Sequence, residues 1–367
     1  MDDKKVLVLT NMYPSKENRS FGIFVKNQVE ALKQRNLQVD VVAITNPHSG
    51  KRNVLKKYFI WGMQTIWALL TKGRSYDVIH AHYVFPSGLL GLLFKWFLHK
   101  RLVVTAHGGD IDKMAKKNAL LFWLTKTILG KADHVIAVGE ELQKQLISTF
   151  SINQNKLSLL NMGVNRKVFK PIDKIQARIQ CGLEQDGQVI LFVGNILEQK
   201  GLLELISSIR ILIQAGEKVT LYIIGAEKST IFKTRLEQKI RDEQINDHIV
   251  FLGVKDQADI ALWMSAADCL VLPSHIEGFG LVALEAMACG TPVIGSEVGG
   301  LKHLLAEGTG VCTPVQNSVE LANNIFTVLS SEEKRNQFIS KGLKKAEEND
   351  QDRIINRLLE VYFPAGG

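Results

Sequence analysis

The chain has 367 residues, of which 46% are hydrophobic and 22% are charged. This length exceeds one ordinary hydrophobic core and predicts two domains of roughly 150–200 residues each. The composition excludes a disordered, collagen-like or repeat protein. The four cysteines lack the C-x-x-C spacing of a zinc site and indicate reduced thiols in a cytoplasmic protein. The apolar segments are too short or too interrupted to predict a transmembrane helix.

Charge is divided unevenly along the chain. The net charge of +8 combines a basic segment, residues 1–170 with 26 Lys/Arg and 11 Asp/Glu, and an acidic segment, residues 171–367 with 19 and 26. A basic half predicts an anionic partner such as phosphate, a membrane surface or nucleic acid. No nucleic-acid recognition motif is present and the aromatic residues lie in apolar helical segments, so we expect no nucleic-acid partner.

Short β-branched runs alternate with helical patterns in the first half of the chain. The strand-like runs are continuously apolar, which indicates strands buried on both faces of a parallel sheet. The predicted strands are residues 4–10, 39–45, 77–82, 101–106 and 134–138. The predicted helices are residues 22–35, 53–72, 87–99 and one that follows residue 106 and ends near residue 130.

The pattern breaks where Gly, Asn and Pro collect at residues 161–171, and it then restarts. Further strands are predicted at residues 189–193, 219–224, 249–252, 269–272, 292–294 and 310–313, and helices at 200–214, 229–244, 256–266, 281–289 and 331–362. Two restarting βα patterns predict an α/β protein with two Rossmann-like domains. Ligands bind beyond the carboxyl ends of such strands, so we expect the site in a deep cleft between the domains.

One loop of the second half carries two carboxylates around a glycine turn. Gly278 and Gly280 let the backbone approach a ligand closely, and the helix start beyond them presents unpaired N–H groups that suit a diphosphate. Glu277 precedes the turn and can reach past the phosphates towards a sugar. Glu285 lies one turn inside the helix, where it can accept two ribose hydroxyl bonds. Alternatively, Glu277 caps the helix and Glu285 lies on a solvated face.

Histidines follow two strands of the first half. His107 precedes Gly108 and Gly109 directly after an apolar strand, so it stands at the carboxyl end of the sheet. A structural histidine is the alternative interpretation. His80 and His82 are spaced to share one face of a strand, but a metal site would lack a third ligand, which favours a structural or acceptor-side role.

Residues 277–290, followed by Thr-Pro-Val-Ile, resemble the E-x7-E signature of the family 4 glycosyltransferases, which are retaining enzymes of the GT-B fold. Residues 194–201 resemble the family's G-x5-K-G phosphate loop, and residues 161–165, 11–14 with 22–24, and 357–362 resemble other family segments. The resemblance covers almost the whole chain. It implies an acceptor-binding domain at residues 1–167, a nucleotide-sugar-binding domain at 168–348, and a helix at 349–367 that returns to the first domain.

The resemblance implies a role for each matching residue. Glu277 would lie near the donor sugar's hydroxyls or anomeric centre, and His107 would contact that sugar and support an oxocarbenium-like transition state. Lys200 would neutralise the diphosphate leaving group, although taken alone it resembles a surface charge. Asn195 replaces the family's usual arginine. Loss of that charged hydrogen bond to the diphosphate would weaken donor binding by ~1.5–3 kcal/mol unless another cation compensates. Further implied positions are Glu285 at the ribose, the backbone of Gly278, Phe279, Gly280 and Leu281 at sugar and phosphate, Gly22 facing the β-phosphate or the acceptor, and Asp110 positioning the acceptor or its own loop.

The resemblance therefore implies a retaining, metal-independent transferase without a cofactor. It would move a sugar from a UDP- or GDP-linked donor to a glycan or lipid-linked acceptor, in cell-envelope or exopolysaccharide biosynthesis. Transfer would take place on one face of the sugar, with the leaving phosphate helping to deprotonate the acceptor hydroxyl. The alternatives are a nucleotide-sugar epimerase or hydrolase of the same fold, and a non-catalytic partner that binds nucleotide sugars.

Residues 51–74 contain six Lys/Arg and no acidic residue, with apolar side chains at helical spacing and two tryptophans. A basic helix with tryptophans can lie in a membrane interface. It can equally be a buried crossover helix with basic ends, and residues 88–101 are similarly ambiguous. In an acceptor domain, this pattern fits a lipid-linked or anionic glycan acceptor and a cytoplasmic protein attached to the inner face of the cell membrane.

Overall fold

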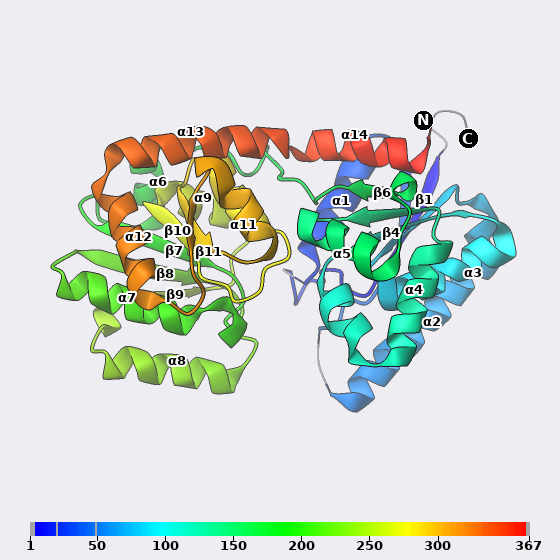
Figure 1. Cartoon of the computed structure of the whole chain (residues 1–367), viewed down its shortest axis with the longest axis horizontal. Helices are drawn as coiled ribbons and strands as arrows, with labels where there is room; N and C mark the ends of the chain where they lie inside the picture. The colour runs from blue at the N-terminus through cyan, green and yellow to red at the C-terminus, as the bar shows by residue number, and fades with distance from the viewer. Residues whose placement is uncertain (1–3, 20, 48–49, 365–367) are drawn as a thin grey trace. The chain divides into compact units, whose positions relative to one another are not determined.

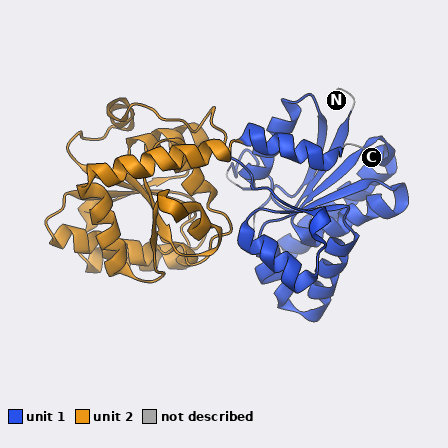
Figure 2. Cartoon of the chain, turned by 45° about the horizontal axis from the view of Figure 1, so that its top comes forward, with its two compact units in different colours: residues 1–163, 351–367 blue, residues 164–350 orange. Residues whose placement is uncertain are grey.

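The computed structural model describes residues 4–19, 21–47 and 50–364. Parallel strands alternate with helices along the chain (Figure 1), which divides into the two compact units coloured in Figure 2. Unit 1 comprises residues 1–163 and 351–367, and unit 2 comprises residues 164–350. The predicted α/β class with two parallel sheets is confirmed. The predicted C-terminal segment 349–367 extends to residues 365–367, which lie outside the described residues.

Unit 1 contains a parallel sheet in the order β2-β1-β3-β4-β5-β6. Its strands are β1 (Lys5–Thr10), β2 (Gln38–Ala43), β3 (Val78–His82), β4 (Arg101–Ala106), β5 (His134–Ala137) and β6 (Leu157–Leu159). One face packs against α2 (Lys51–Lys72), α3 (Leu89–Leu98), α4 (Ala119–Lys131) and α5 (Glu140–Phe150), and the other against α1 (Ile23–Lys33) and α14 (Gln351–Tyr362). Helices on both faces explain why the strands are apolar at successive positions.

Unit 1 differs from the predicted elements in four places. The predicted helix 87–99 begins with an irregular turn over Val84–Gly88, and α3 starts after it. The predicted helix after residue 106 is broken into two short turns ahead of α4, where Asn118 caps the helix by accepting the N–H of Leu121 at 2.9 Å. Helix α5 and the edge strand β6 were not predicted.

Unit 2 contains a second parallel sheet in the order β12-β11-β10-β7-β8-β9. Its strands are β7 (Gln188–Val193), β8 (Val219–Ile224), β9 (Ile249–Gly253), β10 (Cys269–Leu272), β11 (Val293–Ser296) and β12 (Val311–Thr313). Its helices are α6 (Lys174–Cys181), α7 (Leu202–Gln214), α8 (Thr230–Asp242), α9 (Gln257–Ala266), α10 (Leu281–Ala288), α11 (Gly299–Leu305), α12 (Ser318–Ser330) and α13 (Glu332–Glu348). Helices α6, α11 and α12 were not predicted.

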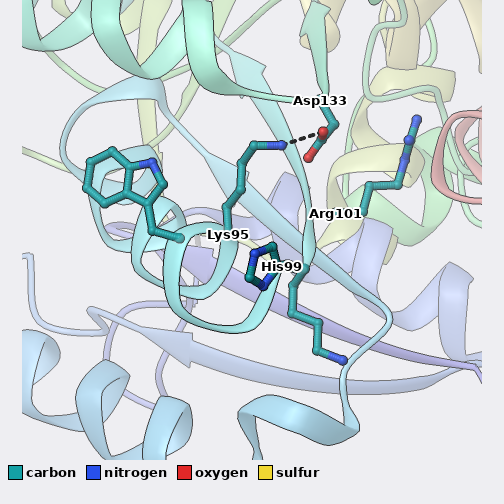
Figure 3. A pocket seen from close by; sticks show the side chains of 6 residues that line it. Lys95, His99, Arg101 and Asp133 are labelled. Carbon is teal, nitrogen blue, oxygen red and sulfur yellow. Dashed lines mark hydrogen bonds and ion pairs between the residues drawn. The ribbon is translucent and has the colours of Figure 1, made fainter.

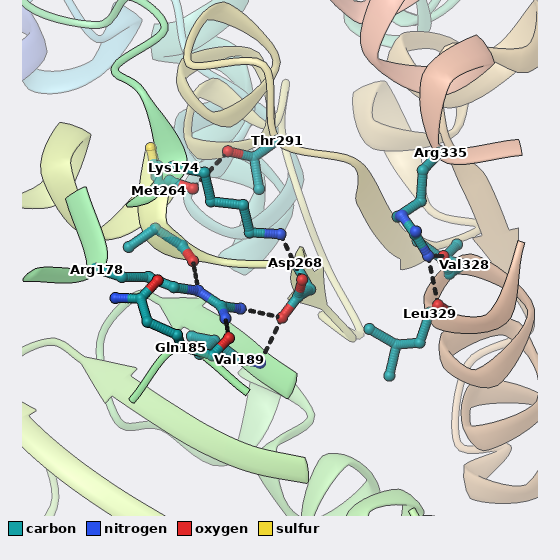
Figure 4. Close-up of polar contacts among 11 residues, drawn as sticks. Lys174, Arg178, Gln185, Val189, Met264, Asp268, Thr291, Val328, Leu329 and Arg335 are labelled. Atoms are coloured by element: carbon teal, nitrogen blue, oxygen red, sulfur yellow. Dashed lines mark hydrogen bonds and ion pairs between the residues drawn. The ribbon is translucent and has the colours of Figure 1, made fainter. Parts of the chain in front are cut away.

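A partly buried ion-paired cluster joins the amino ends of β7 and β10 in unit 2. The Asp268 carboxylate, just before β10, accepts from the Arg178 guanidinium at 2.8 Å, the Lys174 ammonium at 2.5 Å and the backbone N–H of Val189 at 2.6 Å (Figure 4). The Arg178 side chain is only 7% exposed. Removing one partner of such a pair leaves an uncompensated charge, so Asp268 fixes the two strands and α6 together.

The predicted helical segment 331–362 is two helices. Helix α13 belongs to unit 2 and ends at Glu348, and α14 begins at Gln351 and belongs to unit 1. Helix α14 packs against α1 and buries Ile355, Leu358 and Tyr362 in the core of unit 1. The chain therefore leaves unit 1 after residue 163 and re-enters it at residue 351.

Helices α2, α3 and α4 lie side by side and expose many apolar side chains. On α2, Leu55 is 72% and Trp67 is 69% exposed, whereas Trp61 is buried. Helix α2 is therefore not a fully buried crossover helix. None of the helices in the described part of the chain is long and apolar enough to cross a bilayer. The exposed set, here called the apolar face, comprises Leu55, Phe59, Ile60, Met63, Ile66, Trp67, Leu70, Trp96, Phe97, Leu120 and Trp123.

We expect Leu358→Ala to destabilise unit 1 by about 2–5 kcal/mol, because it leaves a cavity between α14 and the sheet. Native-state hydrogen exchange of the β1 amides measures this loss. Glu360→Ala, on the exposed face of the same helix, is the control and should leave exchange unchanged. Equal effects of the two changes would contradict the packing of α14.

Candidate functional site

Strand order defines one favoured ligand position in unit 2. The chain runs outward from β7 through β8 to β9 on one side of the sheet, and from β10 through β11 to β12 on the other. In open parallel sheets, ligands bind beyond the carboxyl ends of the two strands where the order reverses, which here are β7 and β10. The loops that follow these strands are residues 194–201 and 273–280, the two loops singled out in the sequence.

The two loops touch through their backbones. Gly201 has a φ of 69°, and a Cβ there would lie 1.9 Å from the carbonyl oxygen of Pro273. The N–H of His275 donates to the carbonyl of Gln199 at 2.9 Å. Any side chain at residue 201 would separate the loops, so this glycine is required for their contact.

This contact brings Lys200 and Glu277 together. The Lys200 Nζ lies 2.7 Å from Oε2 of Glu277, and the two side chains are 23% and 22% exposed. Both groups are therefore accessible to a ligand while neutralising one another. The pair places a cation and a carboxylate side by side at the carboxyl ends of β7 and β10, where a phosphate can compete for the ammonium.

A second pair of glycines, which was not predicted from the sequence, supports the turn at Glu277. The N–H of Gly300 donates to the carbonyl of Gly278 at 3.2 Å, and a Cβ at Gly299 would lie 2.1 Å from the carbonyl oxygen of Glu277. The available signal was a Gly-Gly pair shortly after a predicted strand. Gly280, at a φ of 91°, is the N-cap of α10, so the turn leads into free N–H groups of the helix.

Glu285 lies in α10 and is buried. It is thus not on a solvated face, which was the alternative interpretation. Burial raises the pKa of its carboxyl to about 8. Ribose hydroxyls would donate to the ionised form, so binding them would oppose the effect of burial. Phe279 and Leu281 pack partly into the core of unit 2, and Asn195 is exposed on the loop after β7.

Unit 1 gathers its candidate residues at the carboxyl ends of β1, β3 and β4. Gly22 is the N-cap of α1 with a φ of 71°, and a Cβ there would lie 2.4 Å from the carbonyl oxygen of Met12. The His107 ring lies 5.1 Å from the Phe24 ring and 4.6 Å from the Tyr83 ring, measured between centroids. The structure therefore groups His107 with the start of α1.

The three histidines of unit 1 form one row. Both ring nitrogens of His80 have partners, the Tyr362 hydroxyl at 2.6 Å and the Thr105 hydroxyl at 2.7 Å. Nδ1 of His82 lies 3.1 Å from Nε2 of His107. The described residues contain no cluster of three or more metal-ligating side chains, and the histidines instead bond to one another and to hydroxyl groups.

Asp110 holds the loop that carries His107. Its carboxylate accepts the N–H of Val84 at 2.7 Å and the N–H of His107 at 3.1 Å, and burial raises its pKa to about 6. This geometry favours the loop-positioning role over contact with an acceptor. Asp110 also starts an Asp-x-Asp triplet, but the exposed Asp112 carboxylate pairs with Lys116 at 3.3 Å.

A basic hollow of about 410 Å³ lies at the opposite, amino ends of β4 and β5 (Figure 3). Its lining cations already have protein partners. Lys95 pairs with Asp133, Lys100 donates to the carbonyl of Arg74 at 2.7 Å, and Arg101 donates to the carbonyl of Val361 at 3.0 Å. It therefore does not compete with the strand carboxyl ends as a nucleotide site.

Two family models match the chain. One, described as Glycosyltransferase Family 4, covers residues 22–168, and the other, described as Glycosyl transferases group 1, covers residues 173–345. The D-inositol 3-phosphate glycosyltransferase of Thermobispora bispora is 32% identical over 329 residues, which are 84% of this chain and 74% of that protein.

Solved structures that match over nearly the whole chain include the following two. Sucrose-phosphate synthase from Thermosynechococcus elongatus superposes with a TM-score of 0.83 at 23% identity, covering 98% of both chains. Anabaena HepE in complex with UDP-glucose superposes with a TM-score of 0.77 at 21% identity, covering 97% of this chain and 98% of that chain. At these identities the likeness concerns the fold, and the predicted GT-B architecture is confirmed.

We expect Glu285→Gln to stabilise the protein at pH 8 by a few kcal/mol and to have little effect near pH 4.5. The pKa of this carboxyl is about 8 in the folded protein, against an ordinary value of 4.5 in the unfolded chain. Between these pH values the unfolded chain binds fewer protons than the folded protein, so the stability of the folded protein falls as pH rises. Thermal unfolding from pH 5 to 9 measures the difference. Glu348→Gln, at an exposed position of unit 2, is the control. If the effect of Glu285→Gln on stability did not change with pH, the raised pKa of Glu285 would be refuted.

Proposed function

Since this chain is a member of the group 1 glycosyltransferases of the GT-B fold, we propose that it is a retaining enzyme that transfers a sugar from a UDP- or GDP-linked donor. The acceptor is a glycan or lipid-linked molecule of cell-envelope or exopolysaccharide biosynthesis. The observation that carries the proposal is the contact between Lys200 and Glu277 at the point where the strand order of unit 2 reverses.

Unit 2 is proposed to bind the donor. Its diphosphate competes with Glu277 for the Lys200 ammonium and accepts from the free N–H groups at the start of α10. Displacing the carboxylate frees Glu277 to accept from the sugar's hydroxyls or to face its anomeric centre. Glu285, four residues into α10, receives the ribose hydroxyls. In this scheme Lys200 is the main diphosphate cation, because residue 195 is asparagine.

The reaction we infer is a substitution on one face of the sugar without a metal ion. The bond between the anomeric carbon and the diphosphate oxygen breaks, and a bond from that carbon to the acceptor oxygen forms on the same face. The acceptor's proton passes to the leaving phosphate. His107 supports the sugar as positive charge develops, and Lys200 neutralises the departing diphosphate.

An epimerase or hydrolase would consume the donor without an acceptor, and a non-catalytic partner would bind it unchanged. The intact set of Lys200, Glu277, Glu285 and His107 favours transfer over both. Product analysis separates the three: a new glycoside, free sugar, or unaltered donor.

The apolar face of unit 1 supports a lipid-linked acceptor at the cytoplasmic side of the cell membrane. Exposed tryptophans beside basic residues suit the interface of an anionic bilayer. A hollow of about 850 Å³ between β2 and α2 continues this face, and its lining includes Val42, Ala43, Met63 and Trp67. An apolar chain emerging from a membrane could enter there.

A panel of UDP- and GDP-sugars, assayed by thermal shift and by donor turnover, tests the proposed activity. At least one should raise the melting temperature by linkage. Lys200→Ala should weaken nucleotide binding roughly 10–100-fold, the cost of a charged hydrogen bond. His107→Ala should lower turnover with little change in nucleotide binding. If no nucleotide or nucleotide sugar stabilises the protein, the proposal fails.

Sedimentation with anionic vesicles tests the membrane surface. We expect Arg52→Glu with Lys56→Glu, both exposed on α2, to weaken binding roughly ten-fold or more, since each basic residue near an anionic surface contributes about 1 kcal/mol. The matched control is Lys33→Glu with Arg357→Glu, exposed on α1 and α14 over the other face of the sheet. Equal binding by both double variants would exclude this surface.

A further inference from the structure

One ring nitrogen of His82 is buried without a hydrogen-bond partner. It is the last residue of β3 and is fully buried. Its Nδ1 faces Nε2 of His107 at 3.1 Å, but its Nε2 has no hydrogen-bond partner among the described residues. A neutral imidazole carries one proton, which can sit on either nitrogen. The two tautomers therefore differ in whether the unpartnered Nε2 carries a proton or a lone pair.

A proton on Nε2 of His82 would bury an N–H donor without an acceptor. Orphaned buried N–H groups are rarer than orphaned acceptors. A proton on Nδ1 instead donates to Nε2 of His107 and leaves only a lone pair without a partner. The second arrangement is therefore favoured. It makes Nε2 of His107 an acceptor and leaves the single proton of that ring on Nδ1.

The His107 Nδ1 differs from the orphaned nitrogen of His82. It has no partner in the described part of the chain, yet it is not among the atoms sealed from solvent. Contacts with Phe24 and Tyr83 hold the ring in place, and the hydrogen bond from its backbone N–H to the Asp110 carboxylate fixes the backbone. The ring thus presents an N–H at the carboxyl end of the sheet, where a substrate oxygen can accept it.

We propose that His82 is a positioning residue that holds His107 as its Nδ1–H tautomer, so that His107 acts as a hydrogen-bond donor to a substrate oxygen. The role of this N–H toward a substrate rests on the proposed function, whereas the assignment of the tautomer does not. The charge state agrees with this assignment, because burial lowers the pKa of His80 and His107 to about 3 and that of His82 well below its usual value. The rings are therefore neutral at neutral pH.

The neighbouring polar groups leave this arrangement intact. The Asp110 carboxylate is occupied by backbone N–H groups, and the Tyr83 hydroxyl faces the Met12 sulfur at 3.2 Å. His80 is held by Tyr362 and Thr105. Among the described residues, His82 is thus the one side-chain hydrogen-bond partner of the His107 ring.

Long-range ¹H–¹⁵N spectra of the full chain labelled with ¹⁵N-histidine test the tautomer without substrate. His107 is assigned among the nine histidines by the signals missing from His107→Gln. We expect a protonated Nδ1 and an unprotonated Nε2. A proton on Nε2 of His107 in the unmodified protein overturns the proposal.

Two substitutions of His82 separate positioning from packing. His82→Asn keeps an N–H donor on the atom bonded to Cγ, as in Nδ1, and should preserve both the His107 tautomer and turnover. His82→Leu keeps similar bulk but no donor, and should shift the tautomer and lower kcat on the order of ten-fold. Nucleotide affinity, proposed for unit 2, should not change in either variant.

An unaltered His107 tautomer in His82→Leu would overturn the proposal. If this variant does not fold, the spectra of the unmodified protein and of His82→Asn still decide, because loss of the Nδ1–H form in the asparagine variant contradicts the role of that donor. A protein that shows the expected tautomer but turns over no nucleotide sugar refutes the proposed function and leaves the positioning role standing.

Discussion

The absence of a side chain at residue 201 is the constraint on which the proposed donor site of unit 2 depends. A Cβ there would lie 1.9 Å from the carbonyl oxygen of Pro273, so only glycine allows the loops after β7 and β10 to touch. Lys200 directly precedes this contact and Glu277 lies four residues beyond it, which explains their separation of 2.7 Å. At the other ends of the same two strands, Asp268 ties β7 to β10.

The two units carry opposite kinds of chemistry. Unit 2 presents a charged pair, together with a buried carboxyl whose pKa is raised to about 8. Unit 1 presents neutral imidazoles, because burial keeps their pKa values far below neutrality. A diphosphate requires cations that can change partners, whereas a sugar hydroxyl requires a donor with a fixed direction. In the proposed function, the ion pair and the histidine row meet these two requirements separately.

The sequence predicted the parallel sheets because their strands are apolar at successive positions, and it identified the loops of Lys200 and Glu277. It could not predict the strand order, which depends on pairing between distant segments. Strand β6 was not predicted because Leu157–Leu159 is only three residues long and has a serine at its centre. The pairing of His82 with His107 could not be predicted either, since it joins the ends of two strands that are 25 residues apart in sequence. For α2, only the structure shows which apolar residues remain exposed.

The path of the chain has a consequence for biosynthesis. Unit 2 is an insertion within unit 1, whose last helix is made only after residues 164–350. While the ribosome is still translating, one face of the first sheet therefore lacks Ile355, Leu358 and Leu359, and His80 lacks the Tyr362 hydroxyl. Unit 2 can complete its core earlier, although its synthesis starts later. The core of unit 2 is thus fully synthesised before that of unit 1, the opposite of the usual order in which the N-terminal domain is completed first. The histidine row receives its last hydrogen-bond partner near the end of synthesis.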